Sequence, residues 1–248
     1  MVRWKLVLEY DGTHFVGWEV QPAQRSVQGA VEEALHQLLQ HPVRVSVSGR
    51  TDSGVHAEGQ VASFVTGAKR DARAIREGLN ALLPVDVACI EAVVVPMSFD
   101  PRRQARIKHY RYRYLCRPSR SPLRSDRVWH LRHPLDDERM HQAVLMLAGT
   151  HDFSSFRAAG CGAKTTVRTL ERWSVARVGD EVVLDAMGHG YLRHMLRIVA
   201  GTAYEIGRRR RPPEWMAQVL AARDRSAAGR TAPARGLTLI EVRYDSVK

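Results

Sequence analysis

The residues best placed to do chemistry lie in a short loop bounded by glycines. Asp52 lies between Gly49 and Gly54 and follows Arg50 by two positions. Glycines let a substrate approach the main chain closely, and a neighbouring guanidinium favours the charged form of a carboxylate. The pattern therefore predicts a reactive acid at Asp52. The competing interpretation is a tight turn in which Asp52 caps its own backbone, the commoner role of aspartate in such loops.

A later segment, 108–114, alternates basic and aromatic residues. The period of two places Tyr110, Tyr112 and Tyr114 on one side of a predicted strand. Stacking of a base on such a ring is worth about 1 to 3 kcal/mol, so the row suits an extruded nucleobase. The alternative is the apolar face of a sheet, which we expect for at least two of the three tyrosines.

Two arginines, Arg193 and Arg197, lie four positions apart in an apolar segment. We predict a helix over 191–207, which would put both on one face. Without further information, a solvated basic stripe is the ordinary interpretation of such a pair.

No metal or cofactor site is predicted. Two histidine pairs occur, but no carboxylate or cysteine completes a ligand set around either. The three cysteines are widely spaced, and the glycine-rich nucleotide-binding loops are absent. The pairs are His130 with His133 and His189 with His194.

The positive charge of the chain is concentrated in its second half. Residues 1–104 hold 11 Lys and Arg against 12 Asp and Glu, whereas residues 105–248 hold 27 against 14. A field of this kind points to a polyanion, most often nucleic acid. No stretch reaches the roughly 18 apolar residues of a membrane span, and no signal segment is recognisable, so we expect a cytoplasmic protein.

The first half has the pattern of strand, helix, strand, strand, helix, strand. Ser26 and Asp71 each precede apolar residues at helical spacing and are predicted to cap helices. The predicted strands cover 2–10, 43–47, 60–65 and 85–95. This is the order of a ferredoxin-like unit, with the Asp52 loop between two strands.

We expect the second half to be a divergent copy of this plan, although the letters of the two halves show no clear repeat. After the strand at 108–114, we predict a helix capped by Asp136 or Asp137, strands over 167–178 and 182–186, the helix over 191–207 and a strand over 237–242. A short helix should follow Pro212, and 221–233 is the best candidate for a mobile loop.

We therefore expect an α+β protein with a mostly antiparallel central sheet and helices packed on it. Its two ferredoxin-like (RRM-like) halves would be residues 1–104, which carry the Asp52 loop, and the basic residues 105–248.

The string at 49–57, GRTDSGVHA, resembles the signature of the tRNA pseudouridine synthase A family. Further matching segments occur in order along nearly the whole chain, although Glu19 stands where the family usually has glutamine. These segments are 9–12 (EYDG), 17–18 (GW), 26–28 (SVQ), Asn80, the Tyr110 strand, 152–157 (DFSSFR), the Arg197 helix and 236–237 (GL).

The resemblance implies isomerisation of uridine to pseudouridine at positions 38, 39 and 40 of tRNA, in the anticodon arm, by a homodimer without cofactor or metal. Asp52 would be the nucleophile, and Tyr110 would pack against the target base and take part in proton removal. Arg197 would pair with the aspartate. Arg50 would help hold the base out of the stack, which enzymes acting on bases require; its alternative is an ion pair with Asp52 or Glu58.

Two other function classes remain open from the residues alone. A noncatalytic RNA-binding module of paired RRM-like units would need an RNP1-like string, and we find none. A carboxylate hydrolase would need a second acid near Asp52, for which Glu58 is the nearest candidate.

Overall fold

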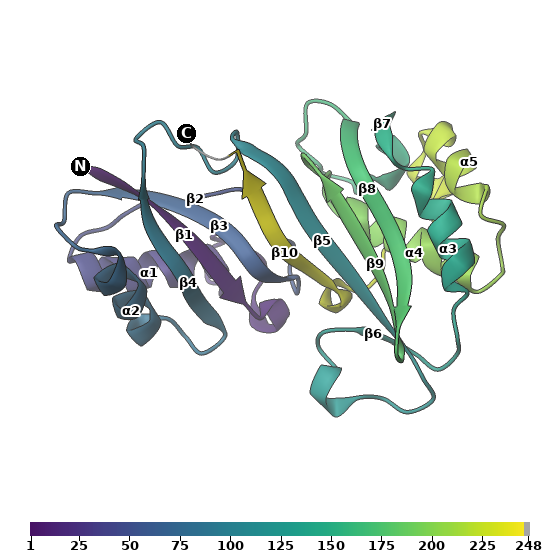
Figure 1. The fold of residues 1–248 in the computed structure, drawn as a ribbon, viewed down its shortest axis with the longest axis horizontal. Helices are drawn as coiled ribbons and strands as arrows, with labels where there is room; N and C mark the ends of the chain where they lie inside the picture. The colour runs from purple at the N-terminus through teal and green to yellow at the C-terminus, as the bar shows by residue number, and fades with distance from the viewer. Residues whose placement is uncertain (246–248) are drawn as a thin grey trace. The chain divides into compact units, whose positions relative to one another are not determined.

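The computed structural model describes residues 1–245 and divides into two compact units. The first comprises Met1–Arg106 and the residues from Leu239 onward, and the second comprises Ile107–Thr238. The chain enters the second unit within strand β5 (Ala105–Cys116) and leaves it within β10 (Leu237–Tyr244), as Figure 1 traces by colour. Within the described residues, no helix is long and apolar enough to cross a membrane.

The described residues of the first unit form two α-helices, one short 3₁₀ helix and a mostly antiparallel sheet. Strand β1 pairs antiparallel with both β3 and β4, and β2 and β10 also neighbour β3. The elements before β5 are β1 (Val2–Tyr10), α1 (Val27–Leu39), β2 (Ser46–Val47), β3 (His56–Thr66), α2 (Ala72–Leu82) and β4 (Val87–Val95).

Local sequence signals explain most of these elements. Alternate residues of β1, from Trp4 to Tyr10, are buried, as expected of a strand with one face in the core. The Ser26 hydroxyl accepts a hydrogen bond from the Gly29 N–H (3.2 Å), and the Asp71 carboxylate accepts one from Ala74 (2.7 Å). Both predicted helix caps are confirmed, because each side chain satisfies a backbone donor that the helix leaves unpaired.

The strand predicted over 43–47 is mostly wrong. Only Ser46 and Val47 form β2. The N–H of Val45 donates instead to the Glu32 carboxylate of α1 (2.9 Å), so a side chain takes the donor that a sheet would have used.

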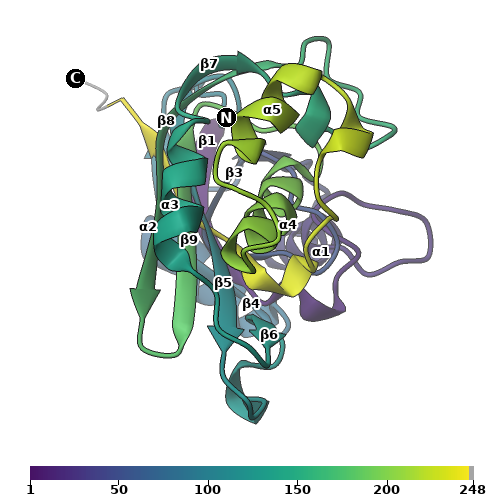
Figure 2. The ribbon, with the colours of Figure 1, turned by 90° about the vertical axis from the view of Figure 1, so that its right-hand side faces the viewer.

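The second unit has the strand order β5-β9-β8-β7, all antiparallel, with β6 added parallel to β5. Figure 1 shows α4 behind β8 and β9, and the turned view in Figure 2 places α4 to one side of the same strands. The further elements are β6 (Trp129–Leu131), α3 (Asp137–Leu145), β7 (Gly149–Asp152), β8 (Val167–Val178), β9 (Glu181–Gly188), α4 (Met195–Gly207) and α5 (Trp215–Ala222). The short strands β6 and β7 were not predicted.

Helix α4 begins four residues later than predicted. His194 has a left-handed backbone (φ 58°), which ends any helical path from Tyr191, so the first helical residue is Met195. Arg193 therefore precedes the helix, and the predicted face shared by Arg193 and Arg197 does not form.

The candidate mobile loop at 221–233 is anchored at its end against α4. The Gly229 N–H donates to the Thr202 hydroxyl (3.0 Å), and the Ala232 N–H donates to the Arg197 carbonyl oxygen (2.9 Å). These two hydrogen bonds join the segment that precedes β10 to the middle of α4.

Most of strand β10 belongs to the first unit, whereas the expected division at residue 104 places it in the second half. From Leu239 onward the chain belongs to the first unit, because Tyr244 is held there. Its hydroxyl donates to the Pro101 carbonyl oxygen (2.8 Å), and its ring packs against Phe99 with ring centres 5.2 Å apart.

Candidate active site

The Asp52 loop is paired through its backbone with the segment after η1 (Gly12–His14). Gly17 and Asp52 form an antiparallel bridge, and the Trp18 N–H donates to the Thr51 carbonyl oxygen (3.1 Å). The Gly54 N–H donates to Phe15 in the same way (3.3 Å). The loop is therefore held as a short ribbon, with the Asp52 side chain half-buried.

A buried hydrogen-bond network supports the loop from inside. The Tyr10 and Thr51 hydroxyls are 2.8 Å apart, and the Gln60 amide donates to the Gly49 carbonyl oxygen (2.9 Å) and to the Tyr10 hydroxyl (3.3 Å). Burial raises the pKa of Tyr10 to about 12, against the opposing effect of its bonds with Thr51 and Gln60. Gln60 was not identified from the sequence, because its role depends on contacts across the unit.

Gly12 lies in direct backbone contact with the loop. A Cβ atom at this position would lie only 2.0 Å from the Val55 carbonyl oxygen, closer than atoms can approach. The Gly12 N–H donates to Nδ1 of the buried His56 (3.1 Å). A glycine is required here because the two backbones pass so close to each other.

Arg50 points out to solvent from the same loop. Its side chain is 67% exposed, and its Nη2 lies 2.5 Å from Oε1 of Glu19, whose side chain is 46% exposed. The expected ion-pair alternatives, Asp52 and Glu58, are not its partners. The ion-pair partner of Arg50 is Glu19 instead.

Tyr110 lies on β5 with its ring held edge-on by Tyr191. The ring centres are 5.1 Å apart at an interplanar angle of 81°, and Tyr110 is 8% exposed. The Tyr191 hydroxyl donates to the Lys108 carbonyl oxygen (3.0 Å), which fixes its own ring. Sequence spacing could not reveal this pair, since the two tyrosines meet only in the folded unit.

The other two tyrosines of the row are core residues, as expected for a sheet face. Tyr112 and Tyr114 are buried, and their hydroxyls each donate at 2.8 Å to the carbonyl oxygens of Pro233 and Ala200. Burial raises the pKa of both phenols, so they stay neutral.

Arg197 lies on α4 and is half-buried. Its Nε donates to the carbonyl oxygen of Ala232 (2.9 Å), the residue whose own N–H donates back to Arg197. These two hydrogen bonds with Ala232 hold the backbone and the Nε atom of Arg197 in place within the second unit.

Other residues of the matching segments have structural roles. The Asn80 amide bonds to both backbone groups of Cys89, at 2.9 and 2.7 Å. Phe153 and Phe156 are fully buried, and the Asp152 carboxylate accepts from Ser154. These contacts stabilise the local structure of their segments.

No group of three or more potential metal ligands occurs among residues 1–245. The histidines considered as ligands have other neighbours. His130 contacts the Arg117 carbonyl oxygen, His133 contacts Arg208, and His189 pairs with Glu171.

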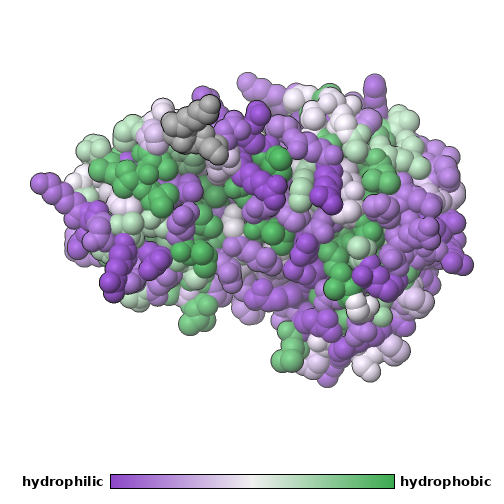
Figure 3. All heavy atoms as spheres, viewed as in Figure 1, coloured by the Kyte–Doolittle hydropathy of each residue, from purple (hydrophilic) through white to green (hydrophobic). Residues whose placement is uncertain are grey.

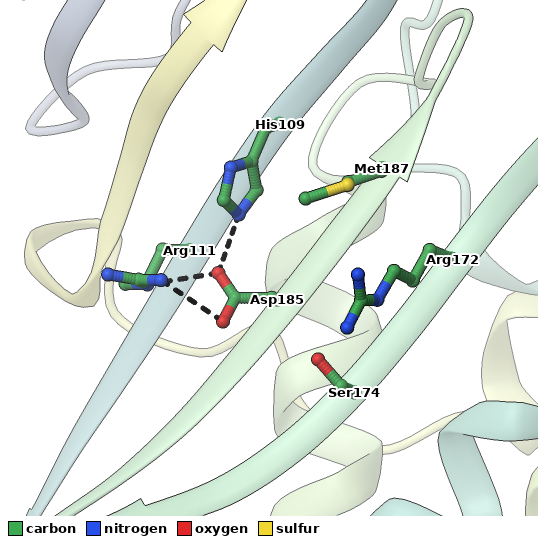
Figure 4. A pocket seen from close by; sticks show the side chains of 6 residues that line it. All are labelled: His109, Arg111, Arg172, Ser174, Asp185 and Met187. Atoms are coloured by element: carbon green, nitrogen blue, oxygen red, sulfur yellow. Dashed lines mark hydrogen bonds and ion pairs between the residues drawn. The ribbon is translucent and has the colours of Figure 1, made fainter.

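A second polar cluster lies on β5, β8 and β9, where it lines a hollow of about 180 Å³ (Figure 4). Asp185 accepts hydrogen bonds from His109 (2.6 Å) and from Arg111 (2.9 Å). Burial favours the neutral acid, but these two bonds outweigh it and hold the pKa of Asp185 below its ordinary value. The hollow is lined by His109, Arg111, Arg172, Ser174, Asp185 and Met187.

This cluster is separate from the Tyr110 ring. His109 and Arg111 flank Tyr110 along the strand, so their side chains point to the opposite face of the sheet. Figure 3 shows the surface over β5, β8 and β9 from that side, with hydrophilic residues prevailing. The cluster therefore belongs to the outer surface of the second unit.

The four candidate site residues are thus distributed over both units. Asp52 and Arg50 share one loop of the first unit, and Tyr110 and Arg197 belong to the second, each in a defined local setting.

Comparison with known proteins identifies the family. The model of the tRNA pseudouridine synthase family matches residues 6–102 and 143–245. The tRNA pseudouridine synthase A of Geotalea uraniireducens is 49% identical over 240 residues, covering 97% of this chain and 98% of the relative. The Myxococcus xanthus protein of the same name is 50% identical over 245 residues, covering 98% and 92%. The chain belongs to the tRNA pseudouridine synthase family.

Proposed function

We propose that this protein isomerises uridine to pseudouridine at positions 38, 39 and 40 in the anticodon arm of tRNA. The observation that carries the proposal is the Asp52 loop: a half-buried carboxylate on a glycine-bounded ribbon, braced from behind by the Tyr10 and Gln60 network. The similarity to tRNA pseudouridine synthases A over nearly the full length of both chains supports it.

The reaction needs one nucleophile and a base that has left the stack. A uridine inside a stem is inaccessible, so it must be flipped into the site before Asp52 attacks it covalently. The glycosidic bond between N1 and C1′ breaks, the uracil rotates, and a bond between C5 and C1′ forms. The bond to Asp52 is released, C5 loses its proton and N1 gains one. The product is an isomer of the substrate, so the balance requires no oxidant or reductant.

Three further residues are assigned roles in this reaction. Tyr110 packs against the target base and takes part in removing the proton, which its ring position beside Tyr191 supports. The Arg197 guanidinium is the partner of the Asp52 carboxylate in the reaction and orients it. Arg50 binds the substrate and helps hold the base out of the stack, which its exposed position supports.

The proposal extends to the assembly. We assign a cytoplasmic homodimer without cofactor, in which residues 105–248 hold the tRNA by its phosphates, as their excess of basic residues favours. Residues 1–104 and 105–248 form two ferredoxin-like domains. The chain order β1-α1-β2-β3-α2-β4 supports the first. The order β5-α3-β8-β9-α4, with β6 and β7 as additions, supports the second, and β10 follows it as the strand whose residues from Leu239 onward group with the first unit.

Replacement of the nucleophile tests the proposal. Asp52→Asn keeps the shape of the side chain but removes its charge, so we expect tRNA binding to persist and the rate to fall on the order of 10⁴-fold or more. The assay incubates an unmodified tRNA transcript with the protein, without added cofactor, and maps pseudouridine chemically. Glu58→Gln is the control, because a hydrolase would need that acid. Full activity of Asp52→Asn would refute the assignment.

A further inference from the structure

The backbone register of the Asp52 loop places Glu19 directly opposite Arg50. The antiparallel bridge between Gly17 and Asp52 sets the pairing. Glu19 lies two residues after Gly17, and Arg50 lies two residues before Asp52. Directly opposite residues of an antiparallel pair have neighbouring side chains, and here they form an ion pair of 2.5 Å. The contact is therefore built into the ribbon that carries Asp52.

Glu19 compensates the charge of the Arg50 guanidinium. Among residues 1–245, Arg50 has no other ion pair or hydrogen bond. A carboxylate and a phosphate offer a guanidinium the same kind of anionic oxygen acceptor. An RNA backbone that reaches Arg50 must therefore displace Glu19, and it then lies beside the freed carboxylate.

We propose that Glu19 sets the affinity of this protein for its RNA substrate by competing with RNA phosphate for Arg50. The inference rests on the proposed function, which assigns Arg50 to substrate binding. Because both side chains are exposed, the pair adds little to the stability of the fold and can open when RNA arrives. Glu19 thereby weakens binding and lowers its dependence on salt.

The test is Glu19→Gln, which frees Arg50 and removes one negative charge. We expect this variant to bind an unmodified tRNA transcript about two- to five-fold more tightly at low salt, the range that an exposed ion pair can supply. The slope of log affinity against log salt should steepen by up to about 0.7 to 0.9, the value for one full phosphate contact.

Glu77→Gln on α2 is the matched control. It makes the same change in net charge and also breaks an exposed ion pair, that of Glu77 with Arg73 (2.8 Å), in the same unit. Its tRNA affinity should equal that of the unmodified protein. Thermal unfolding of both variants verifies that each is folded.

Arg50→Gln completes a double-mutant cycle. If Glu19 acts through Arg50, the gain from Glu19→Gln disappears in the Arg50→Gln background. Equal affinities of Glu19→Gln and Glu77→Gln would overturn the inference, and so would a gain that persists without Arg50. Pseudouridine formation by the unmodified protein is scored separately, so its absence counts against the proposed function while the binding comparison still decides the role of Glu19.

Discussion

Gly12→Ala should displace the loop that carries the candidate nucleophile. The added methyl group would lie 2.0 Å from the Val55 carbonyl oxygen, whereas ordinary contact begins at 3.4 Å. The backbone around Val55 must therefore move by about 1.4 Å, the difference between these distances. Since Val55 follows Asp52 by three residues and its N–H bonds to the Asp52 carbonyl oxygen, the shift passes directly into the loop.

The size of the effect follows from this displacement. Overpacking of this kind costs about 1 to 3 kcal/mol, which lowers Tm by about 2 to 12 °C in a protein of this length. A displacement of about 1 Å at a reacting group can cost about 100-fold in rate. We therefore expect the single-turnover rate of pseudouridine formation to fall about 100-fold, while tRNA affinity changes little.

Gly162→Ala is the control, because a methyl group there would meet nothing within 4 Å. It should match the unmodified protein in Tm and in single-turnover rate. If Gly12→Ala reacts and unfolds like Gly162→Ala, the argument that Gly12 positions the loop by close backbone contact is refuted.

Three further substitutions test the supporting structure. Tyr10→Phe leaves the buried Thr51 hydroxyl without its partner and should cost about 1 to 3 kcal/mol in urea unfolding; an unchanged midpoint would contradict the network. Asp185→Asn removes a carboxylate whose pKa is lowered in the folded protein by its hydrogen bond with His109. The ionised carboxylate contributes its full stabilisation above the unfolded-state pKa near 3.8, and this contribution is lost as the pH falls through the lower pKa of the folded state. The difference in unfolding free energy between the two proteins should therefore shrink below about pH 4, and a pH-independent difference would exclude this linkage. Ser26→Ala removes a helix cap and should lower stability by about 1 kcal/mol in a thermal melt, and no loss would show that the cap contributes nothing.

The elements that sequence predicted well are those with local signals. Ser26 and Asp71 precede apolar periodicity, so the helices begin where a side chain can satisfy the first free N–H groups. The alternating residues of β1 and β5 define strands in the same local way. The Asp52 motif was recognisable because its glycines and its acid lie within one short string.

The features that sequence missed depend on contacts between distant segments. The Val45 N–H is taken by Glu32 of α1, which no pattern within 43–47 reveals. The pairing of Arg50 with Glu19 follows from the register of two loops, and the packing of Tyr191 on Tyr110 follows from the folding of the second unit. Such contacts require the three-dimensional arrangement.

The passage of the chain out of the first unit and back again has a consequence for its synthesis. Strand β3 gains its neighbour β10 only after residues 237–244 have been made, although β3 itself emerges from the ribosome more than 170 residues earlier. An N-terminal fragment ending near Arg106 would leave unpaired the part of the β3 edge that the short strand β2 does not cover, and exposed edges promote aggregation. Nascent chains should therefore depend on rapid completion of translation, and the first unit should be obtained intact by circular permutation rather than by truncation.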